Sequence, residues 1–525
     1  MGVTEWERAC AVIGDCLANG VREFVVCSGA RNAALIEALA QAEAAGHVTL
    51  RRHFEERSAG FFALGRTMAN GEPCAVVTTS GTAVAELLPA MIEARYQGRP
   101  LMAITADRPA RFRGSGAPQA INQLGVFGEH AGRGEWESWD RRSPWHVNVE
   151  FEEAFEVGDG FAAGMADEIR RHGAVWPKPA VSGLARWLKD DLHLGLVVYL
   201  AGLEEADREE VFHFALALGA PVVAEATSGL REALGELVLP DPDRMLKAEP
   251  PGKVLRLGAV PSGRFWRDLE DLPQTEVWNV TRSGHAGLAR ESHTITGEVG
   301  RVLRALGEVE EAGDALDHLV GRSRRLAEME ELLEAYPESE PGLLRTVSHY
   351  ASLGSSVYLG NSLPIREWNL FAQRERPLPE VWANRGANGI DGQLSTWLGV
   401  TAAREGAWCV VGDLTALYDL AAPAMLGQVV TKGRVLVVIN NGGGAIFDRV
   451  RRLRAMSARG RELMLNPQEF SLEGWASMWG LKHVRIEGVE DFDALEAGEQ
   501  MLVVELLPKA AESEAFWSKW DTLSE

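Results

Sequence analysis

The chain has 525 residues, of which 46% are hydrophobic and 24% charged, a composition typical of water-soluble globular proteins. Its formal net charge of −22 argues against nucleic-acid binding and against docking on anionic membranes. It lacks an apolar run long enough to span a bilayer, its N-terminus lacks a signal-peptide pattern, and its five scattered cysteines are typical of reduced core residues. We therefore expect a cytoplasmic protein of several domains.

Short apolar segments alternate with helical segments along the chain. Residues 24–27, 75–78 and 101–105 are predicted to be buried strands, and an Ala-rich helix is expected from Arg31 onward. This alternation predicts an α/β fold whose parallel sheets are flanked by helices.

Changes in composition divide the chain into three expected domains. The first boundary falls near residues 176–179, which contain two prolines, and the next domain begins with the strand-like run 194–202. An acidic helix is predicted over residues 322–340, ended by Pro341, and would connect to the last domain. The expected domains cover residues 1–185, 190–335 and 340–525.

Two polar turns near the C-terminal end suggest a metal and phosphate site. Gly412-Asp413-Leu414 follows one apolar run, and a turn rich in Asn and Gly follows the predicted strand 435–439, with a helix expected over residues 414–428 between them. Mg²⁺ prefers oxygen ligands and takes only a few of them from protein. One carboxylate and one amide at successive strand ends could supply such a half-site.

The second turn reads Asn440-Asn441-Gly442-Gly443. Its glycines would let a diphosphate approach the backbone closely. Either asparagine could be the metal ligand. We choose Asn441 because it leaves Gly443, two residues further on, to give its carbonyl oxygen.

This pair of turns resembles the diphosphate-binding motif of thiamine-diphosphate enzymes, in which Gly-Asp and Asn-x-Gly hold Mg²⁺ on the cofactor. These enzymes also need a carboxyl group against the aminopyrimidine ring of the cofactor, which helps to remove a proton from the thiazolium ring. Glu56, which precedes a Gly- and Ala-rich helix and a strand ending in Thr-Ser-Gly-Thr, matches that group. Its neighbour Glu55 is interpreted as a solvated carboxylate at the helix start, and His53 as a structural histidine on a strand.

Further motifs resemble one family in particular, the menaquinone-pathway synthases that make 2-succinyl-5-enolpyruvyl-6-hydroxy-3-cyclohexene-1-carboxylate. The resemblance runs from about residue 5 to the C-terminus and is weakest through the middle of the chain. Gly-Asp-Leu replaces the Gly-Asp-Gly that is common in other thiamine-diphosphate enzymes. The matching segments are residues 105–109, 116–123, 360–363 with Arg366, 384–392 and 412–420.

The resemblance implies a reaction and its partners. Such an enzyme decarboxylates 2-oxoglutarate and adds the resulting succinyl group to isochorismate in a 1,4-addition, using thiamine diphosphate and Mg²⁺, with Mn²⁺ as the alternative metal. It also implies a homodimer or homotetramer that builds each site at a subunit interface, between the first domain of one chain and the third domain of its partner.

The same resemblance assigns the site residues. Glu56 and Gln119 are expected to be catalytic, and Asp413, Asn441 and Gly443 to bind the metal. Ile390 is expected to be an apolar wedge under the bent cofactor. The cofactor-binding set is Glu56, Thr79, Gln119, Ile390, Gly412, Asp413, Leu414, Asn441, Gly443 and Ile446. The substrate-binding set, whose arginines match carboxylates, is Arg31, Arg108, Arg264, Ser362, Arg366, Arg385 and Phe447.

The chain departs from the family at two places. Residues 27–32 carry Ala30 where a serine hydroxyl is common, and Gly263 precedes Arg264 where Lys-Arg is frequent. Three other interpretations compete with the synthase. They are another thiamine-diphosphate decarboxylase or carboligase, a homologue without cofactor, and a dinucleotide-dependent dehydrogenase, whose Gly-x-Gly-x-x-Gly turn does not follow the strand.

Overall fold

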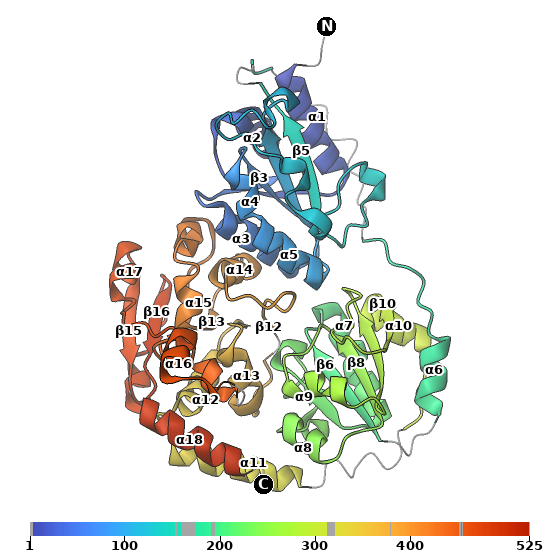
Figure 1. Cartoon of the computed structure of the whole chain (residues 1–525), viewed down its shortest axis with the longest axis vertical. Coiled ribbons are helices and arrows are strands. Elements are labelled where there is room, and N and C mark those ends of the chain that lie inside the picture. Colours follow the sequence, from blue (N-terminus) through green and yellow to red (C-terminus); the bar gives the residue numbers. More distant parts are fainter. Residues whose placement is uncertain are drawn as a thin grey trace. The chain divides into compact units, whose positions relative to one another are not determined.

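The computed structural model describes residues 4–152, 156–158, 174–190, 195–311, 321–378, 380–450, 453 and 455–523. The chain forms two compact units (Figure 1). The first unit comprises residues 1–175 together with two later segments, 391–403 and 418–430. The second unit comprises residues 176–390, 404–417 and 431–525.

The first unit contains a five-stranded sheet in the order β2-β1-β3-β4-β5, in which all pairs are parallel. Strands β3 and β4 are buried along their whole length, as expected for parallel strands covered on both faces. Its strands are β1 (Glu23–Val26), β2 (Thr49–Arg52), β3 (Cys74–Thr78), β4 (Leu101–Asp107) and β5 (Trp145–Glu150). Its α-helices are α1 (Glu5–Ala18), α2 (Ala33–Ala44), α3 (Glu56–Asn70), α4 (Thr82–Glu86), α5 (Leu88–Gln97) and α14 (Gln393–Val400).

Helices α3 and α14 pack so closely that their backbones touch. A Cβ atom on Gly65 would lie 2.2 Å from the Thr396 carbonyl oxygen, and one on Gly399 would lie 2.1 Å from the Phe62 carbonyl oxygen. Both positions therefore require glycine, because real Cβ atoms do not approach backbone oxygens to that distance. Through this contact, a helix from late in the chain completes the first unit.

The second unit contains two sheets. One has the order β10-β9-β8-β6-β7, again with parallel pairs throughout. Its strands are β6 (Leu196–Ala201), β7 (Val222–Ala224), β8 (Lys253–Gly258), β9 (Glu276–Thr281) and β10 (His293–Thr296), and the helices around it are α6 (Ser182–Lys189), α7 (Glu205–Leu218), α8 (Pro242–Ala248), α9 (Arg264–Asp268) and α10 (Val299–Leu306).

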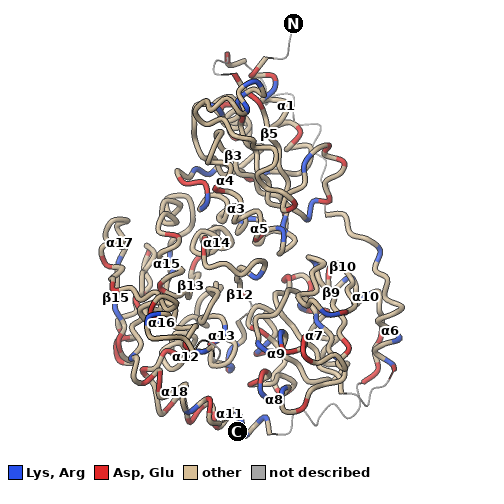
Figure 2. The backbone as a smooth tube through the Cα atoms, viewed as in Figure 1, with Lys and Arg blue, Asp and Glu red and all other residues tan. Residues whose placement is uncertain are grey.

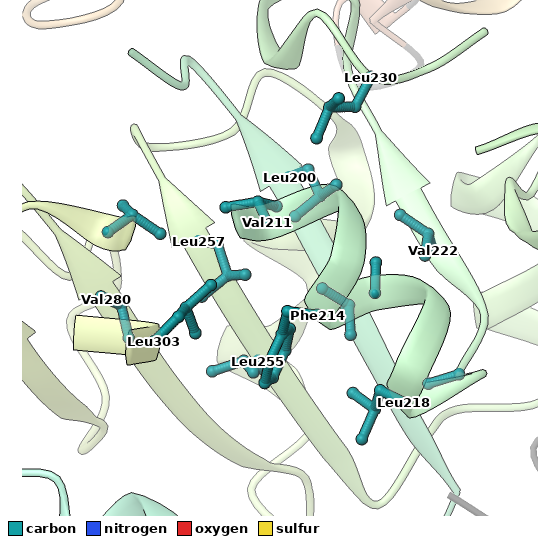
Figure 3. Packing of buried hydrophobic residues seen from close by; sticks show 14 of the residues in the cluster. Leu200, Val211, Phe214, Leu218, Val222, Leu230, Leu255, Leu257, Val280 and Leu303 are labelled. Carbon is teal, nitrogen blue, oxygen red and sulfur yellow. The ribbon is translucent and has the colours of Figure 1, made fainter. Parts of the chain in front are cut away.

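The core of this sheet shows how the sequence pattern produces packing. Buried residues of α7 recur three or four positions apart, at Val211, Phe214 and Leu218, so they form one apolar stripe. Figure 3 shows this stripe facing Leu200 and Leu255 of the sheet. Each such buried side chain contributes roughly 1.5–3 kcal/mol through removal of apolar area from water.

The other sheet has the order β12-β11-β13-β14-β16-β15 and is also parallel throughout. Its strands are β11 (Ser356–Leu359), β12 (Val381–Trp382), β13 (Ala407–Gly412), β14 (Val435–Ile439), β15 (Lys482–Ile486) and β16 (Leu502–Leu506). The α-helices that accompany it are α11 (Arg322–Ala335), α12 (Glu340–Ala351), α13 (Leu363–Phe371), α15 (Asp413–Leu417), α16 (Ala458–Leu465), α17 (Glu473–Met478) and α18 (Ala510–Thr522).

The predicted fold class is confirmed, and so are most of the predicted strands, but two predicted helices are wrong. Residues 322–340 do not form one helix ended by Pro341; α11 ends at Ala335 and α12 begins at Glu340. Pro341 is the second residue of α12. Proline is tolerated there because the backbone N–H groups of the first helical turn have no acceptor within the helix, so the missing N–H costs no hydrogen bond. The predicted helix 414–428 is instead α15 followed by a 3-10 helix, Ala422–Gln428.

Smaller differences concern where elements begin. The expected Ala-rich helix begins at Ala33, after a 3-10 turn over Ala30–Asn32, and not at Arg31. The predicted strand 194–202 is β6, and residue 194 lies outside the described residues. Each of the three sheets falls within one of the three expected domain ranges, and the domain boundaries themselves stay a prediction.

Acidic and basic residues interleave along both units, so the net negative charge is not confined to one segment (Figure 2). Among the described residues, no helix combines the length and apolar character that crossing a membrane requires.

The contact between α3 and α14 gives a first testable prediction. Gly65→Ala should lower the free energy of unfolding by about 3 kcal/mol, because a methyl group there overlaps rigid backbone. Urea unfolding would measure the change. Gly427→Ala is the matched control, since a Cβ at Gly427 has no heavy atom within 4 Å. Equal stability of the two variants would contradict the packing.

Candidate active site

Parallel pairing places three polar loops at one edge of the sheet in the second unit. Strand β13 pairs with β14, with Gly412 opposite Ile439, and β11 pairs with β13 on its other side. The residues that follow these strands are therefore neighbours at the carboxyl ends, which is where ligands bind in open parallel sheets.

Asp413 and Gly443 meet at this edge. Asp413 is 2% exposed, and its two carboxylate oxygens accept hydrogen bonds from backbone N–H groups, Oδ1 from Leu414 at 2.6 Å and Oδ2 from Gly443 at 2.7 Å. Burial raises the pKa of Asp413, and these N–H donors oppose the shift. Gly443 has a φ of 139° and no room for a Cβ, which would lie 2.7 Å from the Leu465 carbonyl oxygen.

The two asparagines of the turn have different partners. Asn440 donates from Nδ2 to Glu505 Oε1 at 2.7 Å and to the Phe470 carbonyl oxygen at 3.1 Å. Asn441 donates from Nδ2 to Glu340 Oε2 at 2.9 Å. The Oδ1 atom of Asn441 is buried and has no hydrogen-bond partner among the described residues.

Glu340 belongs to a pair of buried carboxyl groups. Glu340 at the start of α12 and Glu367 in α13 are 3% and 0% exposed, and their carboxyl groups interact with one another. Burial raises the pKa of Glu340 to about 7, and burial together with the Glu340 charge raises the pKa of Glu367 well above its ordinary value. The pair therefore retains a proton near neutral pH.

A third loop joins this edge through Asn361, which follows β11. Its Nδ2 donates to the carbonyl oxygens of Asn384 and Gly389, both at 2.8 Å, and its Oδ1 accepts from Arg385 Nη1 at 2.9 Å. Asn361 thus fixes the loop that carries two of the expected site residues, Arg385 and Ile390. The next residue, Ser362, has a φ of 76°, a strained value for a residue other than glycine.

Two of the expected substrate arginines, Arg264 and Arg366, line one cavity of about 560 Å³ within the second unit. Burial lowers the pKa of Arg366, and the guanidinium groups of Arg267 and Arg385 lower it further. Such crowding of positive groups favours a bound carboxylate. Acidic side chains share the cavity wall, namely Glu225, Asp241, Asp243, Asp268 and Asp521.

The departure at Gly263 has a local explanation. A Cβ at this position would lie 2.3 Å from the hydroxyl oxygen of Tyr199, so the tyrosine occupies the space that a larger residue would need. Glu225 holds the loop, since its Oε1 accepts from the backbone N–H of Gly263 at 3.0 Å and from the Ser262 hydroxyl at 2.9 Å. Arg264 begins α9 immediately afterwards.

In the first unit, Glu56 is the first residue of α3 and is half-buried. Burial and the nearby carboxylates of Glu55 and Glu86 raise the pKa of Glu56. Glu55 caps the helix by accepting from the backbone N–H groups of Arg57 and Ser58, which confirms its predicted place at the helix start. His53 lies one residue after β2, not on the strand, and its Nδ1 accepts from the Glu55 backbone N–H at 2.9 Å.

Thr79 and Gln119 lie against neighbouring glycines of the first unit. A Cβ at Gly29 would lie 2.5 Å from the Thr79 Cβ, and one at Gly81 would lie 3.1 Å from the Gln119 Cα. Gln119 itself has a φ of 54°. Gln123 anchors this loop, because its Oε1 accepts from the Gly81 backbone N–H at 2.9 Å.

The remaining expected residues have varied surroundings. Arg31 is buried and donates to the Phe151 carbonyl oxygen at 3.0 Å, and the Arg108 guanidinium lies 5.2 Å from the Phe112 ring centroid. Ile446 is half-buried and Phe447 is 36% exposed, both in the 3-10 helix Ala445–Arg449.

Asp419, which we did not predict, ties three segments of the first unit together. It is fully buried, and its carboxylate accepts from the Ser58 hydroxyl at 2.9 Å and from the Ser395 backbone N–H and hydroxyl at 2.7 and 2.9 Å. Ser58 lies two residues after Glu56, and Ser395 lies in the first turn of α14. Burial raises the pKa of Asp419 to about 6.

The residues at the sheet edge fit a hard cation. They offer the carboxylate of Asp413, the unpartnered amide oxygen of Asn441 and the carbonyl oxygen of Gly443, which accepts from the Ala445 backbone N–H at 2.9 Å. Groups of three or more His, Cys, Asp or Glu side chains suited to a metal do not occur among the described residues. A site with one carboxylate leaves coordination positions for phosphate and water, as Mg²⁺ requires.

Comparison with known proteins identifies the family. Residues 8–126 match the family model described as thiamine pyrophosphate enzyme, N-terminal TPP binding domain. A relative from Akkermansia muciniphila, named 2-succinyl-5-enolpyruvyl-6-hydroxy-3-cyclohexene-1-carboxylate synthase, is 46% identical, with 96% of each chain covered. The chain belongs to this synthase family. Synthases of the same name from Bdellovibrio bacteriovorus and Bacillus velezensis are 36% and 31% identical, over 99% and 82% of each chain.

Membership of the synthase family confirms the predicted resemblance over the competing interpretations, and the N-terminal match supports thiamine diphosphate as the cofactor. The individual site residues stay predictions. Three residues inside the matching segments were not predicted to have a role. They are Asn361, Gln123 and Asp419, the last of which lies near the end of segment 412–420. Glu340 and Glu225 were also missed, and they reach the site only through the fold.

The buried Asp419 gives a prediction for pH dependence. Its pKa is about 6 in the folded chain and 3.8 as the ordinary value, so its contribution to stability is fully present below pH 3.8 and is lost as the pH rises through 6. Asp419→Asn removes this loss. Between pH 4.5 and 7, the difference in unfolding free energy between the variant and the parent should therefore shift in favour of the variant by about 2 kcal/mol. Urea unfolding at several pH values would measure it, and a constant difference would contradict the buried titration.

Proposed function

We propose that this chain decarboxylates 2-oxoglutarate and adds the succinyl group to isochorismate, with thiamine diphosphate and Mg²⁺ bound. The observation that carries the proposal is the hydrogen bond from the Gly443 backbone N–H to Asp413, together with the buried and unpartnered Oδ1 atom of Asn441, two residues before Gly443. Relatives that carry the synthase name match nearly the whole chain, and this also supports the proposal.

Asp413, Asn441 and the Gly443 carbonyl would hold the cation, and through it the diphosphate. Asn440 already donates hydrogen bonds to Glu505 and to the Phe470 carbonyl oxygen, and this supports Asn441 as the metal ligand. When bound, thiamine diphosphate supplies a carbon nucleophile and an electron sink for loss of CO₂. Mn²⁺ has similar ligand preferences and could replace Mg²⁺.

Glu56 would hold a proton on its carboxyl oxygen, where it could be exchanged with the aminopyrimidine ring of bound thiamine diphosphate. Its raised pKa supports this role, because a carboxyl that retains a proton nearer neutral pH can both donate and accept one. Arg264, Arg366 and Arg385 bind substrate carboxylates, and their positive charge stabilises negative charge that builds on the acceptor during addition.

The direct test mixes the protein with thiamine diphosphate, Mg²⁺ and 2-oxoglutarate, with and without isochorismate. We expect CO₂ release and formation of the 2-succinyl product when isochorismate is present. Release of CO₂ with unchanged isochorismate would indicate a different acceptor and would overturn the proposed substrate.

Glu56→Gln should lower turnover by at least a hundredfold while leaving unfolding stability and most of the cofactor affinity intact, because glutamine cannot exchange the proton. Steady-state rates and cofactor titration would separate these effects. The matched control is Glu55→Asp, which keeps a carboxylate at the adjacent helix cap and should retain turnover. Normal exchange of the thiazolium C2 proton in the Glu56 variant would show that the assignment is wrong.

We further propose a two-fold homodimer in which each site takes Glu56 from one chain and Asp413 from the other. Glu56→Gln and Asp413→Ala homodimers should then both be inactive. Random co-assembly of equal amounts should recover about a quarter of the parent activity, since half of the dimers are mixed and each has one intact site. Co-expression with two affinity tags would isolate the mixed dimers. Inactive mixed dimers would place the site within one chain.

A further inference from the structure

The turn that would hold the cation contains two adjacent asparagines, and each is bound by a different buried carboxylate. Asn440 donates to Glu505, which is 1% exposed and also accepts from the Ser471 hydroxyl. Asn441 donates to Glu340, which is 3% exposed and comes from the first turn of α12, about a hundred residues earlier in the chain. A contact over such a separation depends on the fold and not on local sequence.

The Glu340 contact decides which way the Asn441 amide faces. An amide presents donors at its nitrogen and an acceptor at its oxygen, on opposite sides of the same carbon. With Nδ2 directed to Glu340, Oδ1 faces away from it, and this oxygen has no hydrogen-bond partner among the described residues. In the flipped amide, Oδ1 would face a carboxylate oxygen and Nδ2 would face the cation, and both contacts would be repulsive.

Glu367 is a second buried carboxyl group beside Glu340. It is 0% exposed, and neither of its oxygens receives an N–H or hydroxyl donor from the described residues. Its carboxyl interacts with that of Glu340.

We infer that Glu340 is a positioning residue that holds the Asn441 amide with its oxygen directed to the cation. This inference rests on the proposed function, because it takes the cation to bind at Asp413 and Asn441. Groups that orient a metal ligand from behind commonly affect metal affinity by about 10- to 100-fold. Glu340 would do so without touching the cation, the cofactor or the substrates.

The test measures the Mg²⁺ concentration that gives half-maximal thiamine-diphosphate binding, by calorimetry and without substrates. Glu340→Leu should raise this concentration about tenfold or more, because Asn441 loses the acceptor that fixes its amide. Glu340→Gln should keep it within about threefold, since the glutamine oxygen can still accept from Nδ2. A Glu340→Leu protein with an unchanged Mg²⁺ requirement would overturn the inference.

Two controls separate positioning from general damage. Glu505→Leu removes the carboxylate behind the neighbouring Asn440 and should leave the Mg²⁺ requirement within about threefold of the parent value. An equal rise in the Glu505 and Glu340 variants would mean that any loosening of the turn has the same effect, which also overturns the inference. If Glu340→Leu does not fold, Glu340→Asp replaces it, because its carboxyl is withdrawn by one methylene. The same rise is expected, and no rise overturns the inference.

Asn441→Ala, measured in parallel, distinguishes the inference from the function on which it rests. If Asn441→Ala binds thiamine diphosphate with the parent's Mg²⁺ requirement, the proposed metal site is wrong. If Asn441→Ala loses Mg²⁺-dependent binding while Glu340→Leu retains it, the metal site stands and only the positioning role of Glu340 is overturned.

Discussion

The parallel pairing of β13 with β14 is the constraint on which the rest of the site depends. Both strands are buried along nearly their whole length, so their register is fixed by the side chains that must face each layer of helices. A shift of one residue would turn every side chain to the opposite face. Register therefore determines that Asp413 and Gly443 emerge within hydrogen-bonding distance, although α15, a 3-10 helix and β14 separate them in sequence.

The second unit buries both carboxyl groups and a guanidinium group, and burial disfavours the charged form of each. Glu340, Glu367 and Glu505 are buried carboxyl groups around the asparagine turn, and such groups are costly in a low-dielectric interior unless they are paired or protonated. On the cavity side, the crowded guanidinium of Arg366 has a lowered pKa. The proposed cation and substrate carboxylates would each meet groups of opposite charge at these places, although the net charge of the chain is −22.

The sequence allowed prediction of features that depend on local pattern. The strand 435–439 was predicted with its observed bounds, because an apolar run between turn residues is a local signal. The prediction of one helix over 322–340 was wrong because Pro337 interrupts that stretch and α11 ends at Ala335, whereas Pro341 is a favourable residue in the first turn of α12.

Long-range contacts could not be predicted in the same way. The choice between Asn440 and Asn441 had no strong local signal, since the two residues are identical and adjacent. They differ only in their partners, Glu505 and Glu340, which come from separate elements. Asp419 similarly reaches Ser58 across more than three hundred residues of chain. Nothing in the sequence around these residues reports such contacts, because they are created by the packing of whole elements.

The first unit is built from segments that lie far apart in the chain, and this affects how it folds during synthesis. Its sheet is complete by residue 150, but α14 and Asp419 belong to segments 391–403 and 418–430. During translation from the N-terminus, the Gly65 face of α3 is therefore exposed until some 240 further residues have left the ribosome, roughly 12–48 s at 5–20 residues per second. During that interval the nascent chain presents an apolar surface on which a chaperone could bind, and a fragment that stops before residue 391 would keep that surface permanently.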